Sequence, residues 1–318
     1  MKRRLALLAP VLLILTSCGG GGAKPVDEIA FTRNVDGFDE IWVMHDDGSQ
    51  RRRLTDAAPP KHQSGGASMP VWSADGKQLA YTVATSDRGR SDVYVMDADG
   101  GDQHVVTSGA GVNTQPTWSP DGSRIAFARF GAQRGIAVIP ADGGAATQLT
   151  NSGGAVFDAA PAWSPDGTSI AFTRIVVKTD FEHQQEAIYL TGANGSGAKK
   201  LIDGGGAPAW SPDGTRIAYT SVRDHNGRTC FEECTPSGEI YVANADGSNA
   251  RRLTRSKADD QMPTWSPDGR SIAFVSDRSD PQLHDSEIYV MRADGSGLHR
   301  ITFAGAWSLD PAWRPTAE

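Results

Sequence analysis

Long hydrophobic runs are almost absent from this sequence. The one extended apolar stretch, Leu5–Leu15, follows the cations Lys2, Arg3 and Arg4. A membrane-spanning helix needs about 20 apolar residues, so this stretch is too short to cross a bilayer. A basic segment followed by a short apolar one is typical of a secretory signal. We therefore predict a signal peptide over residues 1–17, and we expect no membrane-spanning segment after it.

Cysteine is also scarce, with three residues in the chain. The first, Cys18, follows Leu15-Thr16-Ser17, and this string resembles the lipobox of bacterial lipoproteins. In that class, cleavage occurs before the cysteine, which then carries acyl chains. Each buried methylene stabilises such an anchor by about 0.8 kcal/mol. We expect a lipidated Cys18 and a Gly-rich tether over residues 18–25. An ordinary secretory signal with an incidental cysteine is the alternative.

The other two cysteines, Cys230 and Cys234, lie close together in the sequence. An even pair in an exported protein predicts a disulfide. A zinc site is the second interpretation, although two cysteines supply only half of a tetrahedral ligand set.

The mature chain is expected to have fewer basic than acidic residues. The signal peptide contains three of the 31 Lys and Arg residues and none of the 38 Asp and Glu residues, so the mature chain carries a formal charge of −10. Such an acidic body argues against nucleic acid as a partner.

Catalytic motifs are missing as well. The sequence has no Gly-x-Ser-x-Gly elbow, no His-Glu-x-x-His pair and no complete phosphate loop. We therefore predict a protein that is not an enzyme, with no cofactor and no assigned metal site.

One motif recurs along the whole chain. It reads Trp-Ser-Pro-Asp-Gly or a variant of it, and its tryptophans lie 45 to 55 residues apart. This period is typical of one four-stranded propeller blade. A tryptophan at the same register of each unit predicts packing between blades. The six are Trp72, Trp118, Trp163, Trp210, Trp265 and Trp313.

Short β-rich runs complete each unit. After the Asp-Gly come Ile-Ala-Phe, then Ile-Tyr-Val-Met, then a second Asp-Gly and a closing Leu-Thr, with small variations. Asp-Gly between apolar runs indicates a β-hairpin. The first unit lacks its Trp strand, and Pro311–Trp313 supplies one at the C-terminus. We predict an all-β, six-bladed propeller of four-stranded antiparallel blades over residues 26–318. The N-terminal strands pair with the C-terminal strand and close the ring.

These strings together resemble the TolB-like, or WD40-like, propeller repeat. The resemblance covers about residues 26–315 and recurs six times. It is a resemblance to the family and not to TolB itself. TolB carries an α/β domain ahead of its propeller and is soluble, and this sequence is expected to differ in both respects.

The loops expected to bind a partner lie on one face of the disc. This face carries the inter-blade links 56–69, 151–160 and 303–310 and the second hairpins 176–186, 222–238 and 276–286. Variable loops on a rigid scaffold are a common place for binding. The candidate binding residues in these loops are His62, His183, His225, Phe231, Glu232, Glu233, His284 and Trp307.

The predicted function is a lipid-anchored scaffold in the bacterial cell envelope, exposed outside the cytoplasm. We expect a monomer that binds an envelope protein or peptide and is attached to the membrane by its N-terminal lipid. The alternative is a carbohydrate-active, lyase-like or metal-dependent enzyme, or a glycan-binding module, on the same face. That alternative follows from the loop histidines, because the TolB-like propellers include polysaccharide lyases with a histidine-rich metal centre.

Overall fold

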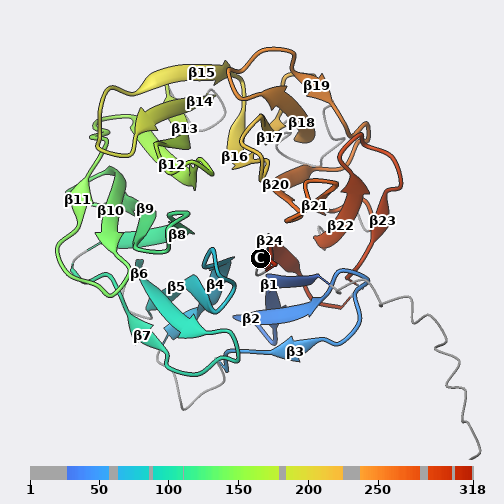
Figure 1. Ribbon diagram of the computed structural model, residues 1–318, viewed down its shortest axis with the longest axis horizontal. Helices are drawn as coiled ribbons and strands as arrows, with labels where there is room; N and C mark the ends of the chain where they lie inside the picture. The colour runs from blue at the N-terminus through green and yellow to red at the C-terminus, as the bar shows by residue number, and fades with distance from the viewer. Residues whose placement is uncertain are drawn as a thin grey trace, which may run out of the picture.

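The computed structural model describes residues 27–56, 64–85, 89–109, 111–178, 184–224, 237–279, 286–302 and 305–316. Within these ranges the regular structure consists of β-strands, and the described part of the chain contains no helix long and apolar enough to cross a membrane. Figure 1 shows the strands arranged as a ring of small sheets around a central axis, with the red C-terminal end lying beside the blue N-terminal strands. The prediction of an all-β propeller is confirmed.

The strands form antiparallel groups of four, here called blades, which are listed from the axis outward. Blade 1 contains β24 (Ser308–Trp313), β1 (Glu28–Val35), β2 (Phe38–His45) and β3 (Arg52–Arg53). Blade 2 contains β4 (Ser64–Trp72), β5 (Gln78–Thr85), β6 (Arg90–Asp97) and β7 (His104–Val105). Blade 3 contains β8 (Val112–Trp118), β9 (Arg124–Phe130), β10 (Gly135–Pro140) and β11 (Thr147–Gln148).

The remaining strands repeat the same order. Blade 4 contains β12 (Val156–Trp163), β13 (Ser169–Val177), β14 (Gln184–Gly192) and β15 (Lys199–Asp203). Blade 5 contains β16 (Gly206–Trp210), β17 (Arg216–Ser221), β18 (Glu239–Asn244) and β19 (Arg251–Arg252). Blade 6 contains β20 (Asp260–Trp265), β21 (Ser271–Ser276), β22 (Glu287–Arg292) and β23 (His299–Arg300). Five of the six outermost strands have only two residues and β15 has five, so the unpaired edges are short.

The core lies between the blades. The middle strands of each blade bury their Ile-Ala-Phe and Ile-Tyr-Val-Met runs, because neighbouring sheets cover both faces. Trp118, for example, packs with Phe127 of its own blade and with Val93 and Val95 of blade 2. Each such buried side chain contributes about 1.5–3 kcal/mol of hydrophobic stabilisation. Five of the six repeat tryptophans are buried, and Trp210 is half-buried.

Each innermost strand contains a β-bulge just before its proline. The register shifts there, and the residue preceding the proline has a φ between 46° and 57°, which is uncommon outside glycine. These residues are Met69, Gln115, Ala160, Ala207, Met262 and Asp310. The bulge interrupts the two-residue period of the strand. For that reason β4, β12 and β24 begin inside the links predicted at 56–69, 151–160 and 303–310.

The chain ends meet in blade 1. Strand β24 pairs antiparallel with β1, so a C-terminal strand completes a sheet begun at the N-terminus. Phe31 and Trp313 of this blade pack against Ile288 and Val290 of blade 6 in a cluster like those between the other blades. Arg314 reinforces the join, because it forms an ion pair with Glu28 at 2.5 Å and its guanidinium lies 4.7 Å from the ring centre of Trp72.

Replacing Arg314 should therefore weaken the ring. Arg314→Ala removes the Glu28 pair, the stacking on Trp72 and a hydrogen bond to the Gly76 carbonyl. We expect the free energy of unfolding to fall by about 1–2 kcal/mol, measured by urea denaturation. The control is Arg270→Ala, because Arg270 is 84% exposed and lies 3.9 Å from Asp268. That variant should change stability by less than about 0.5 kcal/mol. Equal losses in the two variants would contradict this account of the closure.

Candidate binding face

The two faces of the disc are defined by their connections. First and third hairpins lie together on one face. In blades 2–6 a backbone N–H of the third hairpin donates to a carbonyl of the first, as from Ala98 to Lys77 and from Ala245 to Thr215. We call this the hairpin face. The second hairpins and the links between blades lie at the opposite ends of the strands, and we call that side the link face.

Connection lengths differ sharply between the faces. Every first hairpin leaves five residues between its strands, and every third hairpin leaves six. On the link face, the second hairpins range from two residues in blade 1 to 17 in blade 5, and the links range from two to ten. The scaffold repeats closely from blade to blade, and its variation is concentrated on the link face.

The uniform turns of the hairpin face are maintained by one hydrogen-bond pattern. In the first hairpin of blade 3, Ser119 donates to Asp121 at 2.5 Å, and the backbone N–H of Ser123 donates to the same oxygen at 3.0 Å. These bonds lower the pKa of Asp121 to about 2, with the Ser119 hydroxyl as the largest cause. The Asp-Gly pairs of the first hairpins thus act as turn residues.

Trp307 is the predicted binding residue that falls within the described ranges. It lies on the link face, directly before β24, and the residue is 50% exposed. Its backbone carbonyl accepts a hydrogen bond from Asn34 at 3.0 Å, so the link is fixed against the end of β1. The predicted lipidation site Cys18 and the pair Cys230 and Cys234 lie outside the described residues, as do the other candidate binding residues. These other candidates are His62, His183, His225, Phe231, Glu232, Glu233 and His284.

The six bulge residues form a ring around the axis, and all six are half-buried. The backbone N–H groups of five of them donate to a side chain of the preceding blade. Met69 donates to Thr32 of blade 1 at 3.0 Å, and Ala207 donates to Thr173 of blade 4 at 2.9 Å. The ring presents two methionines, two alanines, the amide of Gln115 and the carboxyl of Asp310. This axial ring was not predicted from the sequence, although the residue before each repeated proline marks it.

Asp310 is the charged member of the axial ring. Its carboxyl accepts a hydrogen bond from the Thr32 hydroxyl at 2.8 Å. Burial raises the pKa of Asp310, and the nearby carboxylate of Asp39 raises it further. Proton binding at this position is therefore favoured by the fold, in contrast to the turn aspartates of the hairpin face.

Buried ion pairs lie near the strand ends that meet the link face. Asp158 of blade 4 is fully buried and accepts from Arg174 at 2.6 and 2.8 Å and from Thr150 of blade 3 at 2.6 Å. The pKa of Arg174 is raised by this bond. Asp260 and Arg278 form the corresponding pair at the boundary of blades 5 and 6. Such pairs fix the ends of the strands from which the variable segments begin.

At the boundary between blades 2 and 3, an amide side chain takes the place of the buried carboxylate. Asn113 occupies the position of Asp158 in the repeat, and it accepts from Arg129 at 3.2 Å while donating to Asp92 at 3.0 Å. Without a carboxylate in direct contact, the pKa of Arg129 is lowered by burial. The same register therefore holds a direct ion pair in one blade and an Arg–Asn–Asp relay in another.

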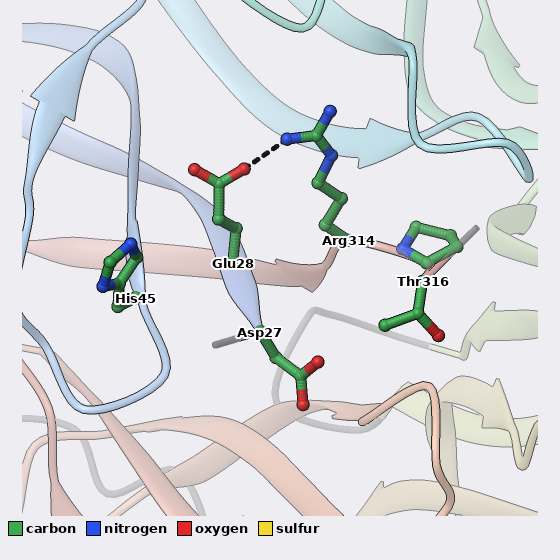
Figure 2. A pocket seen from close by; sticks show the side chains of 6 residues that line it. Asp27, Glu28, His45, Arg314 and Thr316 are labelled. Carbon is green, nitrogen blue, oxygen red and sulfur yellow. Dashed lines mark hydrogen bonds and ion pairs between the residues drawn. The ribbon is translucent and has the colours of Figure 1, made fainter. Parts of the chain in front are cut away.

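No group of three or more potential metal ligands occurs among the described residues. A cavity of about 340 Å³ lies on the hairpin face, between Asp27 and Glu28 on one side and Arg314, Pro315 and Thr316 on the other. Figure 2 shows Glu28 and Arg314 paired at its edge, with Asp27, His45 and Thr316 around it. Blade 1 has no continuous first hairpin, and this cavity occupies the place of that turn.

The sequence model of the TolB β-propeller domain matches residues 60–174 and 177–318. The chain belongs to the TolB β-propeller family. The Tol-Pal system protein TolB of Bordetella pertussis is 54% identical over 48 residues, which is 14% of this chain and 11% of that protein. The TolB of Thioalkalivibrio sulfidiphilus is 41% identical over 56 residues, or 16% of this chain and 13% of that protein. The matched segments thus span about an eighth of these relatives.

Solved structures share the fold over most of the chain. TolB from Acinetobacter baumannii superposes with a TM-score of 0.70 at 20% identity, covering 91% of this chain and 67% of that one. A chain of the nidogen–laminin complex gives 0.65 at 10% identity, with coverages of 91% and 98%. Oligogalacturonate lyase in complex with manganese gives 0.54 at 16% identity, with coverages of 87% and 74%. At these identities the likeness concerns the fold alone.

The raised pKa of Asp310 predicts a pH-dependent stability. Its stabilising contribution is complete below the ordinary pKa of an aspartate and is lost as the pH rises through the raised value. Asp310→Asn keeps an acceptor for Thr32 and cannot ionise. We expect this variant to melt at a higher temperature than the native protein at pH 8 and at the same temperature at pH 4.

The matched control is Asp158→Asn, which leaves the guanidinium of Arg174 without its carboxylate. This variant should melt at a lower temperature than the native protein at pH 8. If Asp310→Asn also lowered the melting temperature at pH 8, the assignment of an unfavourable buried charge to Asp310 would be wrong.

Proposed function

We propose that this protein is a lipid-anchored component of the cell envelope whose link face binds a protein or peptide partner. The observation that carries the proposal is the contrast between the faces. Connections of constant length on the hairpin face need only join strands, whereas the link face varies from two to 17 residues on the same scaffold. Segments that vary on a rigid framework are typical of binding surfaces.

Two further features support a protein partner. The family includes the Tol-Pal system proteins TolB, which resemble this chain over short segments. Trp307 places a large, half-exposed aromatic ring on the link face, and tryptophan is enriched among residues that dominate protein–protein binding. The methionines of the axial ring, Met69 and Met262, add adaptable apolar surface nearer the axis.

Truncation of Trp307 should weaken partner capture. Loss of a central tryptophan costs an interface about 2 kcal/mol or more, which corresponds to roughly a 30-fold rise in Kd. We expect Trp307→Ala to recover far less of a crosslinked envelope partner than the native protein. The control is Leu298→Ala, because Leu298 is 41% exposed and lies on the hairpin face. Equal recovery with both variants, or loss only with Leu298→Ala, would contradict binding at the link face.

The anchor is tested separately. Cys18→Ser removes the thiol that would carry a lipid, and we expect the exported protein to leave the membrane fraction and become soluble. Mass spectrometry of the native protein should then find acyl chains on the N-terminal cysteine. A native protein that is already soluble after export would exclude the lipid anchor and leave the binding proposal standing.

The lyase-like alternative predicts a different result. A metal-dependent enzyme on this face would retain a divalent transition metal after purification, and it would depend on the loop histidines. Elemental analysis of the purified mature protein, combined with an assay on polygalacturonate, distinguishes this alternative from a binding protein. We favour binding because the similarity to oligogalacturonate lyase concerns the fold alone.

A further inference from the structure

We infer that the lipid tether holds the hairpin face toward the membrane and keeps the link face directed away from it. This inference rests on the proposed lipidation of Cys18, and it goes further by assigning which face a partner can reach. It follows from the position of Asp27, the first described residue, and from the number of residues between Cys18 and Asp27.

The described part of the chain begins at Asp27, on the hairpin face. The carbonyl of Asp27 accepts a hydrogen bond at 2.8 Å from Asp46, a residue of the third hairpin of blade 1. The next residue, Glu28, accepts a backbone hydrogen bond from Arg314 at 2.8 Å and pairs with the guanidinium of the same arginine. Figure 2 shows Asp27 beside this pair. The tether therefore joins the disc on the side opposite the link face.

The tether also joins the disc away from its rim. Strand β1 is the second strand from the axis, with β2 and β3 outside it. Neighbouring strands lie about 4.8 Å apart, so a chain leaving Asp27 must travel roughly 10 Å to pass the rim. The eight residues of β1 span roughly 25 Å between the two faces. Reaching the plane of the link face therefore requires roughly 35 Å of chain.

The available chain is shorter than this path. Nine peptide units separate Cys18 from Asp27. Fully extended, they reach roughly 30 Å, and as a flexible coil their mean reach is only roughly 17 Å. A lipid at Cys18 therefore cannot enter the bilayer while the link face lies flat against it. With the hairpin face toward the membrane, the same tether needs no stretching.

The orientation determines how a partner approaches. A partner of the link face must come from the side away from the anchoring membrane, either as a soluble protein or as one attached to the opposing surface. The uniform turns of the hairpin face, by contrast, lie within the short distance that the tether spans.

The test compares the distances of the two faces from a bilayer. An azide-bearing amino acid is placed at Ser123, in the first hairpin of blade 3, or at Gln133, in the second hairpin of the same blade. Both side chains are exposed. The lipidated full-length protein is labelled with a donor dye and reconstituted into phosphatidylcholine vesicles that carry an acceptor on the headgroups. We expect clearly higher transfer efficiency from position 123 than from position 133.

A second pair, Thr168 and Lys178 on blade 4, repeats the comparison at another place on the disc; both are exposed and lie on the hairpin and link faces, respectively. Equal efficiencies, or higher efficiency from the link face, would overturn the inference while leaving link-face binding intact. Failure of the native protein to float with vesicles would instead refute the lipid anchor, and the orientation with it.

Discussion

The structure depends on the pairing of β24 with β1. A ring of blades is stable only if every blade has two neighbours, because each hydrophobic cluster is formed by side chains of adjacent sheets. Blade 1 satisfies this condition with strands from both ends of the chain. The ion pair of Arg314 and Glu28 and the hydrogen bond from Thr32 to Asp310 lie on this join, at the hairpin face and at the axis, respectively.

In the closed ring, connections of constant length lie on one face and connections of variable length lie on the other. The hairpin face is held by repeated turns in which a serine and an aspartate satisfy the backbone, and its connection lengths do not vary. On the link face, the variable segments begin at strand ends that are fixed by buried ion pairs such as that of Asp158 and Arg174. Variable segments can therefore differ between blades without disturbing the ring. In the orientation that we infer, the tether joins the hairpin face and leaves the link face available to a partner.

Much of the fold could be predicted from the sequence, because the Trp motif repeats with the period of a blade and Asp-Gly marks the hairpins. The bulges were missed, since a residue such as Met69 or Ala160 carries no signal for a positive φ beyond the proline that follows it. The buried pairs were missed too. Asp158 and Arg174 are 16 residues apart, and pairing across β12 and β13 becomes visible only once the register is known. Of the predicted binding residues, Trp307 lies among those the structure describes, and the histidine and cysteine predictions remain predictions.

Crosslinking mass spectrometry on intact envelopes can determine whether partners bind the link face. Exposed lysines report on both sides, with Lys178 and Lys257 on the link face and Lys77 and Lys199 on the hairpin face. We expect crosslinks to other proteins from Lys178 and Lys257, and few or none from Lys77 and Lys199. Crosslinks that come mainly from the hairpin-face lysines would contradict binding at the link face.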